Sequence, residues 1–319
     1  MAYTTANDRL SNSRAYTFFK CPQLYTYQYI EKLYPRPGTV SVENWLPRQR
    51  GTILHGALEY AILGKDTEAG ARQAFEEVCN PSFPRQPAGP AQREALEALM
   101  PELVQVAKNA AEFLQIEDWE PLIFNGKPMV EIEVSHPIAG FKDFMGYVDI
   151  VMRHKPTGRV YAADWKSVTR FASPEDEVYR GQLLLYAKCL KHMGVHIDGA
   201  AIIQLKPELA KRATRKLRVD SGSIDGPRES ECGKFMFTPT LYSEEYINNY
   251  FASFERTAQA MARFKPEEAY VNMGGFQCSG CDYKSLCQAT LQGQDAEYIR
   301  NTKYTQSGAS KRASLNIVI

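Results

Sequence analysis

The sequence predicts an α/β protein with a core of the order αβββαβ around a mixed central sheet. Three observations predict it: a helical pattern at residues 50–63, three strand-like runs between residues 131 and 167, and a further helix followed by the buried-type strand 199–205. The second and third runs form a hairpin and are antiparallel, whereas a helix that leads back into the same sheet makes a parallel crossover. The predicted sheet is therefore mixed.

Length and composition set the outer limits. The chain has 319 residues, enough for a substantial core, and we expect residues 1–300 to form a single domain. Because the formal net charge is only +1, any contact with nucleic acid has to use a local patch. No secretion signal is evident, and no apolar run approaches the roughly 18 residues of a membrane span, so we expect a soluble cytoplasmic protein without membrane contacts.

The first helices are marked by prolines and possible caps. We expect residues 1–12 to be a loose polar leader, Ser13 to cap a helix that ends at Lys20, and Pro22 to begin a second helix. Cys21 then lies at the joint between the two. The next helix, at residues 50–63, places His55 and Glu59 four residues apart on one face. A lone helical histidine is more often a surface or core residue than a ligand.

Two further helical patterns, at 66–79 and 91–116, are separated by a proline-rich stretch and suggest a helical insertion at about 66–116. The strand that follows, 131–136, carries Glu131 and Glu133 on one face. Such glutamates more often form a solvated edge than a ligand pair, and we expect the same here.

The hairpin carries the charged residues that most constrain its chemistry. Its strands, 146–153 and 160–167, flank Lys155-Pro156-Thr157-Gly158, and a loop of these four residues places Asp149 opposite Asp164. Opposed Cβ atoms lie roughly 4.5–5.5 Å apart, where like charges repel. Period-2 alternation adds Lys166 to the same face. An exposed Asp-Lys ion pair is the ordinary interpretation, but the apolar flanks predict burial and favour a divalent cation between the carboxylates.

After the hairpin, Ser173 and Pro174 are expected to begin a helix that stops at Gly194. Gln182 and Tyr186 share one face of it, although each alone is an ordinary helical position. The strand 199–205 completes the crossover.

The remaining stretch contains a basic run, a strand, a helix and a tail. Residues 206–218 hold six lysines and arginines against one glutamate, a pattern typical of a solvated face that can also follow a phosphate backbone. We expect a strand at 234–238, a helix capped by Ser243 that runs to Phe264, and a flexible tail at 301–319.

Seven cysteines, without a secretion signal, favour metal ligation or free thiols over disulfides. Cys278, Cys281 and Cys287 form a C-x-x-C-x5-C pattern, which is an incomplete metal shell, and Cys21 is the best candidate for a fourth ligand. The cluster-binding segments would be 13–30 and 270–290. Zinc and an iron-sulfur cluster both accept four thiolates, so the spacing leaves the metal open.

Four short motifs occur in a fixed order along the chain. They are G-x-x-x-H at Gly51–His55, G-x-x-D at Gly146–Asp149, D-x-K at Asp164–Lys166 and Q-x-x-x-Y at Gln182–Tyr186. Together with the four cysteines, this set resembles the PD-(D/E)XK nuclease superfamily, specifically RecB-like exonucleases with a [4Fe-4S] cluster, such as AddB-type nucleases and CRISPR-associated and viral exonucleases. The resemblance covers roughly residues 13–290 and omits the insertion and the tail.

The resemblance implies a restriction-endonuclease-like core and a metal-dependent DNA exonuclease. Such an enzyme hydrolyses phosphodiester bonds in single-stranded DNA or at DNA ends, in recombination, repair or phage DNA processing, in the cytoplasm of a bacterium or of a phage-infected host. The implied catalytic residues are Asp149, Asp164 and Lys166; the implied Mg²⁺ or Mn²⁺ ligands are His55, Asp149 and Asp164; the implied substrate-binding residues are Gln182 and Tyr186; and the implied ligands of [4Fe-4S], or alternatively Zn²⁺, are Cys21, Cys278, Cys281 and Cys287.

Two other functions remain open. The chain could be a nucleic-acid end-binding module that keeps the fold and cluster without cleavage, although its complete set of acids and lysine argues against decay. It could also be a zinc protein whose hairpin acids are only structural. The sequence has no G-x-x-x-x-G-K-[ST] motif, so a helicase or recombination partner protein would have to supply any unwinding.

Overall fold

The computed structural model describes residues 5–36, 39–80, 88–171, 177–206, 228–229, 235–272 and 278–306. The basic run from residue 207 onward and the expected helix start at Ser173 lie outside these residues. The described helices include none that is long and apolar enough to cross a membrane.

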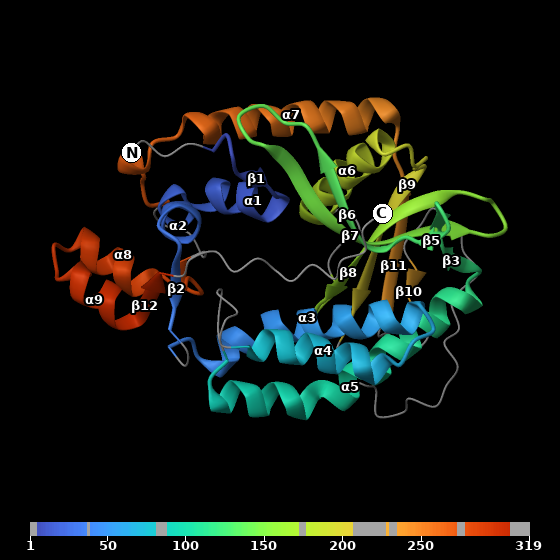
Figure 1. Ribbon diagram of the computed structural model, residues 1–319, viewed down its shortest axis with the longest axis horizontal. Coiled ribbons are helices and arrows are strands. Elements are labelled where there is room, and N and C mark those ends of the chain that lie inside the picture. Colours follow the sequence, from blue (N-terminus) through green and yellow to red (C-terminus); the bar gives the residue numbers. More distant parts are fainter. Residues whose placement is uncertain are drawn as a thin grey trace.

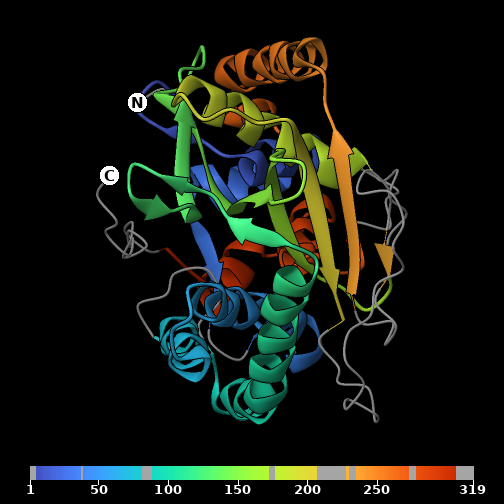
Figure 2. The same cartoon turned by 90° about the vertical axis from the view of Figure 1, so that its right-hand side faces the viewer.

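A mixed sheet forms the centre of the molecule, as the sequence predicts (Figures 1 and 2). Its antiparallel part is β6 (Val130–His136), β7 (Asp143–His154) and β8 (Val160–Ser167). Strand β9 (Gly199–Leu205) then pairs parallel with β8, and β11 (Phe235–Leu241) pairs antiparallel with β9. Three short strands extend it, namely β1 (Arg9–Leu10), β3 (Trp119–Pro121) and β10 (Arg228–Glu229).

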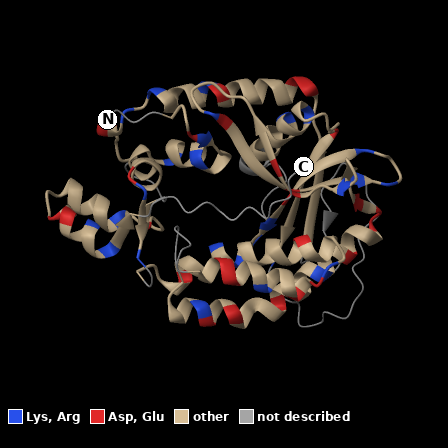
Figure 3. Ribbon diagram, in the orientation of Figure 1, with Lys and Arg blue, Asp and Glu red and all other residues tan. Residues whose placement is uncertain are grey.

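Helices cover both faces of this sheet (Figure 1). Helices α3 (Val42–Ile62), α4 (Thr67–Cys79) and α5 (Pro90–Ile116) pack below it, and α6 (Glu177–His192) and α7 (Glu244–Arg263) pack above it. Side chains alternate along a strand, so neighbouring residues of β8 join different cores. Ala163 joins the core between the sheet and α3–α5, and Ala162 joins the core between the sheet and helices α6 and α7. Charges of both signs are interspersed on the outer helices (Figure 3).

The first and last described segments of the chain lie together beside the sheet (Figure 1). Near the N-terminus lie α1 (Asn12–Lys20), α2 (Pro22–Tyr25), a π-helical turn at Thr26–Ile30 and β2 (Leu33–Pro35). Near the C-terminus lie a 3₁₀ turn at Pro266–Glu268, α8 (Lys284–Leu291), α9 (Ala296–Lys303) and β12 (Tyr304–Gln306), which pairs with β2. A small hairpin of β4 (Ile123–Phe124) and β5 (Lys127–Pro128) completes the described elements.

The expected loose leader is wrong for its second half. Arg9 and Leu10 pair parallel with β7, and the Arg9 guanidinium forms ion pairs with Asp143 and Glu133. Leu10 is completely buried, so apolar burial and charge pairing both hold this segment. The first helix is capped by Ser11, whose hydroxyl accepts the N–H of Arg14, and not by Ser13.

The expected flexible tail is also wrong for residues 301–306, which belong to α9 and β12. Tyr304 is 3% exposed, its ring stacks on Tyr283 with centroids 5.3 Å apart, and its hydroxyl donates to the Asp282 carbonyl. Helix α3 likewise begins at Val42, well before the expected residue 50. It runs through Pro47, where a proline removes one backbone hydrogen bond, and the completely buried Trp45 anchors this first part.

Candidate functional site

The hairpin has the predicted register, but its two strands part at the carboxylates. The ladder runs from Arg153↔Val160 to Ile150↔Ala163, and the His154 N–H donates to the Arg159 carbonyl, so Asp149 and Asp164 follow as the next opposed pair. Backbone pairing stops before them. Instead, Asp149 Oδ2 accepts the backbone N–H of Trp165 at 2.7 Å. A carboxylate thus takes a position that a backbone carbonyl would hold in a continuous ladder.

Glu131 is a third carboxylate at this fork. The pairs Val130↔Ile150 and Ile132↔Val148 place it opposite Asp149, and its backbone adopts the left-handed φ of 51°. Its Oε1 lies 3.8 Å from His55 Nδ1. The expectation that Glu131 belongs to a solvated edge is therefore wrong, because β6 pairs with β7 in a register that brings it to the hairpin acids. The sequence pattern does not show how β6 pairs with β7, and this register is the signal that would have identified Glu131.

Glu133, two residues further on, does behave as an edge residue. It forms an ion pair with Arg9 and accepts the Tyr147 hydroxyl at 2.9 Å. Burial raises its pKa, but the hydrogen bonds from Arg9 and Tyr147 lower it by more, so the net pKa is below its usual value.

Helix α3 delivers His55 to the carboxylates with a defined orientation. Its Nε2 lies 3.1 Å from the Trp165 carbonyl oxygen, a pairing that requires a proton on Nε2. Nδ1 therefore faces the acids, 3.4 Å from Asp149 Oδ1. Burial lowers the pKa of His55, but the two carboxylates raise it by more, and the net pKa is well above its usual value. Burial raises the pKa of Asp149, and His55 and Lys166 lower it by more.

These three side chains fit a divalent cation. The donor atoms of His55, Glu131 and Asp149 all lie within 4.8 Å of one another. Adjacent ligands of an octahedral ion with bonds of about 2.1 Å are about 3.0 Å apart, so the observed separations would have to close by at most about 1.8 Å. Two carboxylates with one imidazole are also donors that manganese accepts readily. The Trp165 carbonyl accepts the hydrogen bond from His55 Nε2.

Asp164 lies beside this group, at the end of β8. It is 3% exposed; its Oδ2 is 2.5 Å from Lys166 Nζ, and its Oδ1 accepts the Gln182 amide at 3.3 Å. Burial raises the pKa of Asp164 to about 6, although Lys166 acts in the opposite direction. The ionised form is therefore destabilised even with a lysine in contact.

Gln182 and Tyr186 do meet, as their spacing predicts. The Gln182 amide donates to the Tyr186 hydroxyl at 2.8 Å and so joins that hydroxyl to Asp164. Tyr186 is only 6% exposed, and its ring lies against Gly146, where an added Cβ would be 2.3 Å from Cε1. The glycine of G-x-x-D thus provides space for the tyrosine of Q-x-x-x-Y. Any role of Tyr186 in binding a ligand has to act through Gln182.

Glu131, Asp149 and Asp164 line one cavity of about 830 Å³, which also reaches Lys166 and helices α1, α3 and α4. We call it the acidic cavity. It is lined by five carboxylates, from Glu59, Glu77, Glu131, Asp149 and Asp164.

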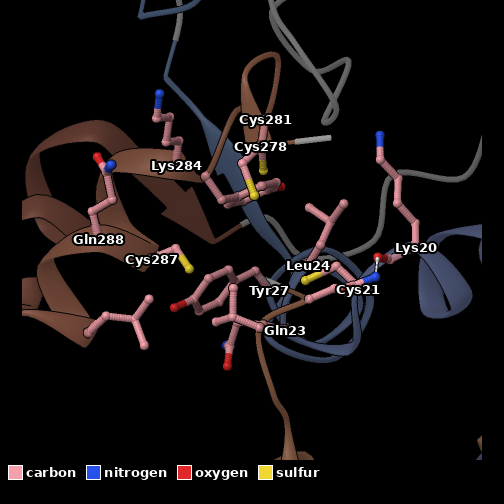
Figure 4. Close-up of a pocket in the computed structure, with 14 residues that line it drawn as sticks. Lys20, Cys21, Gln23, Leu24, Tyr27, Cys278, Cys281, Lys284, Cys287 and Gln288 are labelled. Carbon is pink, nitrogen blue, oxygen red and sulfur yellow. Dashed lines mark hydrogen bonds between the residues drawn. The ribbon is translucent and has the colours of Figure 1, made fainter. Parts of the chain in front are cut away.

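The four predicted cysteines surround a second, smaller pocket of about 190 Å³ (Figure 4). Cys21 lies between α1 and α2, Cys278 and Cys281 lie in the turn before α8, and Cys287 lies within α8. Their sulfurs face a common space whose walls include Leu24, Tyr27 and Leu291. Burial raises the pKa values of Cys281 and Cys287, and the neighbouring cysteines add to the rise. Sequence positions more than 250 residues apart therefore converge on one set of thiols.

Of the comparisons with known proteins, the family profile agrees with the fold and the motifs. A search of curated protein sequences gives no significant match. The crystal structure titled SSO0001 is similar at 10% sequence identity and a TM-score of 0.32, with 74% of this chain and 84% of that chain covered, which is too weak to support an argument. The profile of the PD-(D/E)XK nuclease superfamily, in contrast, matches residues 9–288 and so spans the helix with His55, the hairpin, α6 and all four cysteines of the pocket. The chain belongs to the PD-(D/E)XK nuclease superfamily.

Proposed function

We propose that this protein is a divalent-metal-dependent deoxyribonuclease of the exonuclease type, acting on single-stranded DNA or DNA ends. The observation that carries the proposal is the fork between β7 and β8. It gathers a histidine, three carboxylates and a lysine in one open cavity. The exonuclease assignment and the roles in recombination, repair or phage DNA processing rest on the resemblance of the ordered motifs to RecB-like exonucleases.

The proposed metal ligands are His55, Asp149 and Glu131, with Asp164 beside them. When bound, a divalent cation offsets phosphate charge and lowers the pKa of a coordinated water. Nε2–H of His55 donates to the Trp165 carbonyl, which keeps Nδ1 aimed at the site. The Trp165 N–H holds Asp149 in the same way.

Lys166 and Gln182 supply the remaining functions. The Lys166 ammonium is partly exposed to the cavity, so it can donate to the attacking water or to a phosphate oxygen while it stays near Asp164. Gln182 donates to Asp164 and so fixes the carboxylate that faces Lys166. The Tyr186 hydroxyl accepts the Gln182 amide, so Tyr186 holds Gln182 in place and is a positioning residue.

The test uses single- and double-stranded DNA labelled at either end, with Mg²⁺, Mn²⁺ or EDTA. An exonuclease releases short products from one labelled end at the earliest times, whereas an endonuclease first gives intermediate lengths. Asp149→Ala should abolish cleavage, and Glu94→Gln, at an exposed position of α5, should not. Tight DNA binding without cleavage in any metal would favour the non-cleaving end-binding module.

We further propose that the cysteine pocket holds a [4Fe-4S] cluster. Four thiolates around one zinc ion, with bonds of about 2.3 Å, lie about 3.8 Å apart and leave no cavity between them. Among the described residues, the one group of three or more His, Cys, Asp or Glu donors that could hold a metal ion contains no cysteine, and the four thiols line a pocket of about 190 Å³. This wider arrangement supports a cluster over a single ion. We also propose a helicase or recombination partner protein, and this part rests on the resemblance to RecB-like exonucleases alone.

Anaerobically purified protein should be brown, and iron and sulfide analysis should find four of each per chain. Cys281→Ala should lose the colour, whereas Cys189→Ala, a buried cysteine outside the pocket, should keep it. Colourless protein with one stoichiometric zinc would reject the cluster.

A further inference from the structure

A third hollow, of about 410 Å³, adjoins the acidic cavity. Arg48 and Thr52, one turn apart on α3, line both hollows. On the opposite wall, helix α1 contributes a single stripe at spacing i, i+3, i+4 and i+7. Ser13, the first residue of this stripe, lines the acidic cavity. The third hollow is lined by the other three, Tyr16, Thr17 and Lys20. We call this third hollow the α1–α3 groove, after the two helices labelled in Figure 1.

Tyr16 offers an aromatic face in this groove. It is 56% exposed, and among the described residues no ring or cation is stacked on it. Phe19, on the same helix, is 64% exposed but does not line the groove. An exposed ring beside a charged groove is the arrangement on which an unpaired base stacks.

The charge of the α1–α3 groove is opposite to that of the acidic cavity. Lys20 and Arg48 line it, and Asp282 is the one carboxylate among its described lining residues. Asp282 Oδ2 is 2.7 Å from Arg48 Nη1, and Arg48 keeps further donors because a guanidinium has five N–H groups. Among the described residues, no carboxylate lies within the 4.0 Å of an ion pair from Lys20 Nζ. The groove therefore attracts phosphates that the acidic cavity, without its cation, repels.

We propose that the α1–α3 groove binds the single-stranded DNA segment next to the scissile phosphate, with a base stacked on Tyr16 and backbone phosphates near Lys20 and Arg48. The proposal rests on the proposed nuclease function and adds the path of the substrate. A single strand fits better than a duplex, because paired bases are stacked on one another and cannot offer a face to Tyr16. The groove then places the next phosphate of the strand in the acidic cavity.

Binding is measured first without metal, so that no cleavage occurs. The probe is a fluorescent oligothymidine of about 12 nucleotides, and anisotropy in EDTA gives Kd. Tyr16→Ala should raise Kd roughly 5- to 150-fold, the range for one base–aromatic stack. Tyr16→Trp keeps an aromatic face and should bind like the wild type. The matched control, Phe19→Ala, should bind like the wild type. Lys20→Gln should reduce the slope of log K against log salt by about 0.7, as expected for one lost phosphate contact with a single strand.

Kinetics separate this inference from the proposed function. With Mn²⁺, Tyr16→Ala should raise KM for the oligonucleotide but hydrolyse bis(p-nitrophenyl) phosphate, which is too small to reach the groove, at the wild-type rate. If Tyr16→Ala and Phe19→Ala bind and cleave DNA alike, the groove is not the strand-binding site, while nuclease activity stands. If the wild type hydrolyses neither substrate, the proposed function fails, and anisotropy alone decides about the groove. The inference is also overturned if the wild-type protein binds a blunt duplex but does not bind the single strand.

Discussion

Replacing Asp164 with asparagine should stabilise the metal-free protein above about pH 6 and leave it nearly unchanged below about pH 4. Burial raises the pKa of Asp164 from its usual 3.8 to about 6. The folded protein therefore binds this proton more tightly than the unfolded chain does. The stability that Asp164 contributes is complete below pH 3.8 and is lost as the pH rises through about 6. Asparagine cannot ionise and escapes this loss.

The magnitude follows from the same two values. One pKa unit corresponds to about 1.4 kcal/mol, so ionising Asp164 inside the fold costs at most about 3 kcal/mol of unfolding free energy. The attraction of Lys166 at 2.5 Å is already contained in this pKa, so the limit needs no further deduction for the lost ion pair. A rise of roughly 2–8 °C in Tm near pH 8 is the expected result for a domain of this size.

The assay is thermal unfolding in EDTA across the pH range, with wild type, Asp164→Asn and the surface control Glu94→Gln. Saturating Mg²⁺ at roughly 100 times Kd should then stabilise the wild type by about 2.7 kcal/mol and the Asp164 variant by less. A difference between wild type and variant that stays constant from about pH 4 to pH 8 would refute the electrostatic reasoning. Equal responses to Mg²⁺ would mean that Asp164 does not contribute to the cation site.

The other predictions concern single residues. Lys166→Ala should abolish DNA cleavage yet keep Tm within about 2 °C of wild type, because its amine is partly exposed; gel assay and thermal unfolding check both. Glu131→Gln should raise the Mn²⁺ concentration needed for half-maximal activity about 10-fold or more, and an unchanged Mn²⁺ titration would remove Glu131 from the ligand set. Cys281→Ala should lower Tm together with the brown colour, and a retained Tm would show that the pocket is not structural. Gly146→Ala should destabilise the fold by roughly 1–3 kcal/mol in chemical denaturation, because its Cβ would lie 2.3 Å from the Tyr186 ring, and a smaller loss would mean that the ring can shift.

Local signals explain which parts of the fold could be predicted from the sequence. The hairpin register was predictable because a Pro-Gly turn of four residues fixes which positions oppose each other. The crossover was predictable because a long amphipathic helix between two buried strands has one common solution. The two-residue strand at Arg9–Leu10 and the short β12 were missed, because segments this short have no periodicity. Their pairing depends on distant residues.

The site shows the same division. The motifs place His55 and Asp149 on long elements with a clear pattern, and the structure brings these two side chains within 3.4 Å of each other. Glu131 was dismissed because its position depends on how β6 pairs with β7, and its left-handed φ has no counterpart in sequence pattern. The parting of the strands at Asp149 was also not predictable, since it shows only in the hydrogen bond to the Trp165 N–H. Local patterns gave the identities of most groups, and tertiary pairing set their geometry.

The charges at the fork explain why this site should require a cation. Three carboxylates, from Glu131, Asp149 and Asp164, face two groups that can be positive, the His55 imidazole and the Lys166 ammonium. Without metal, the carboxylates raise the pKa of His55 and so favour a proton on it, whereas burial is the main reason that ionised Asp164 is destabilised. A divalent cation at His55 Nδ1 would displace that proton and bring more charge to the same carboxylates. Under the proposed function, a bound cation would offset the charge that destabilises the metal-free site, and the positively charged groove beside it would attract the DNA strand.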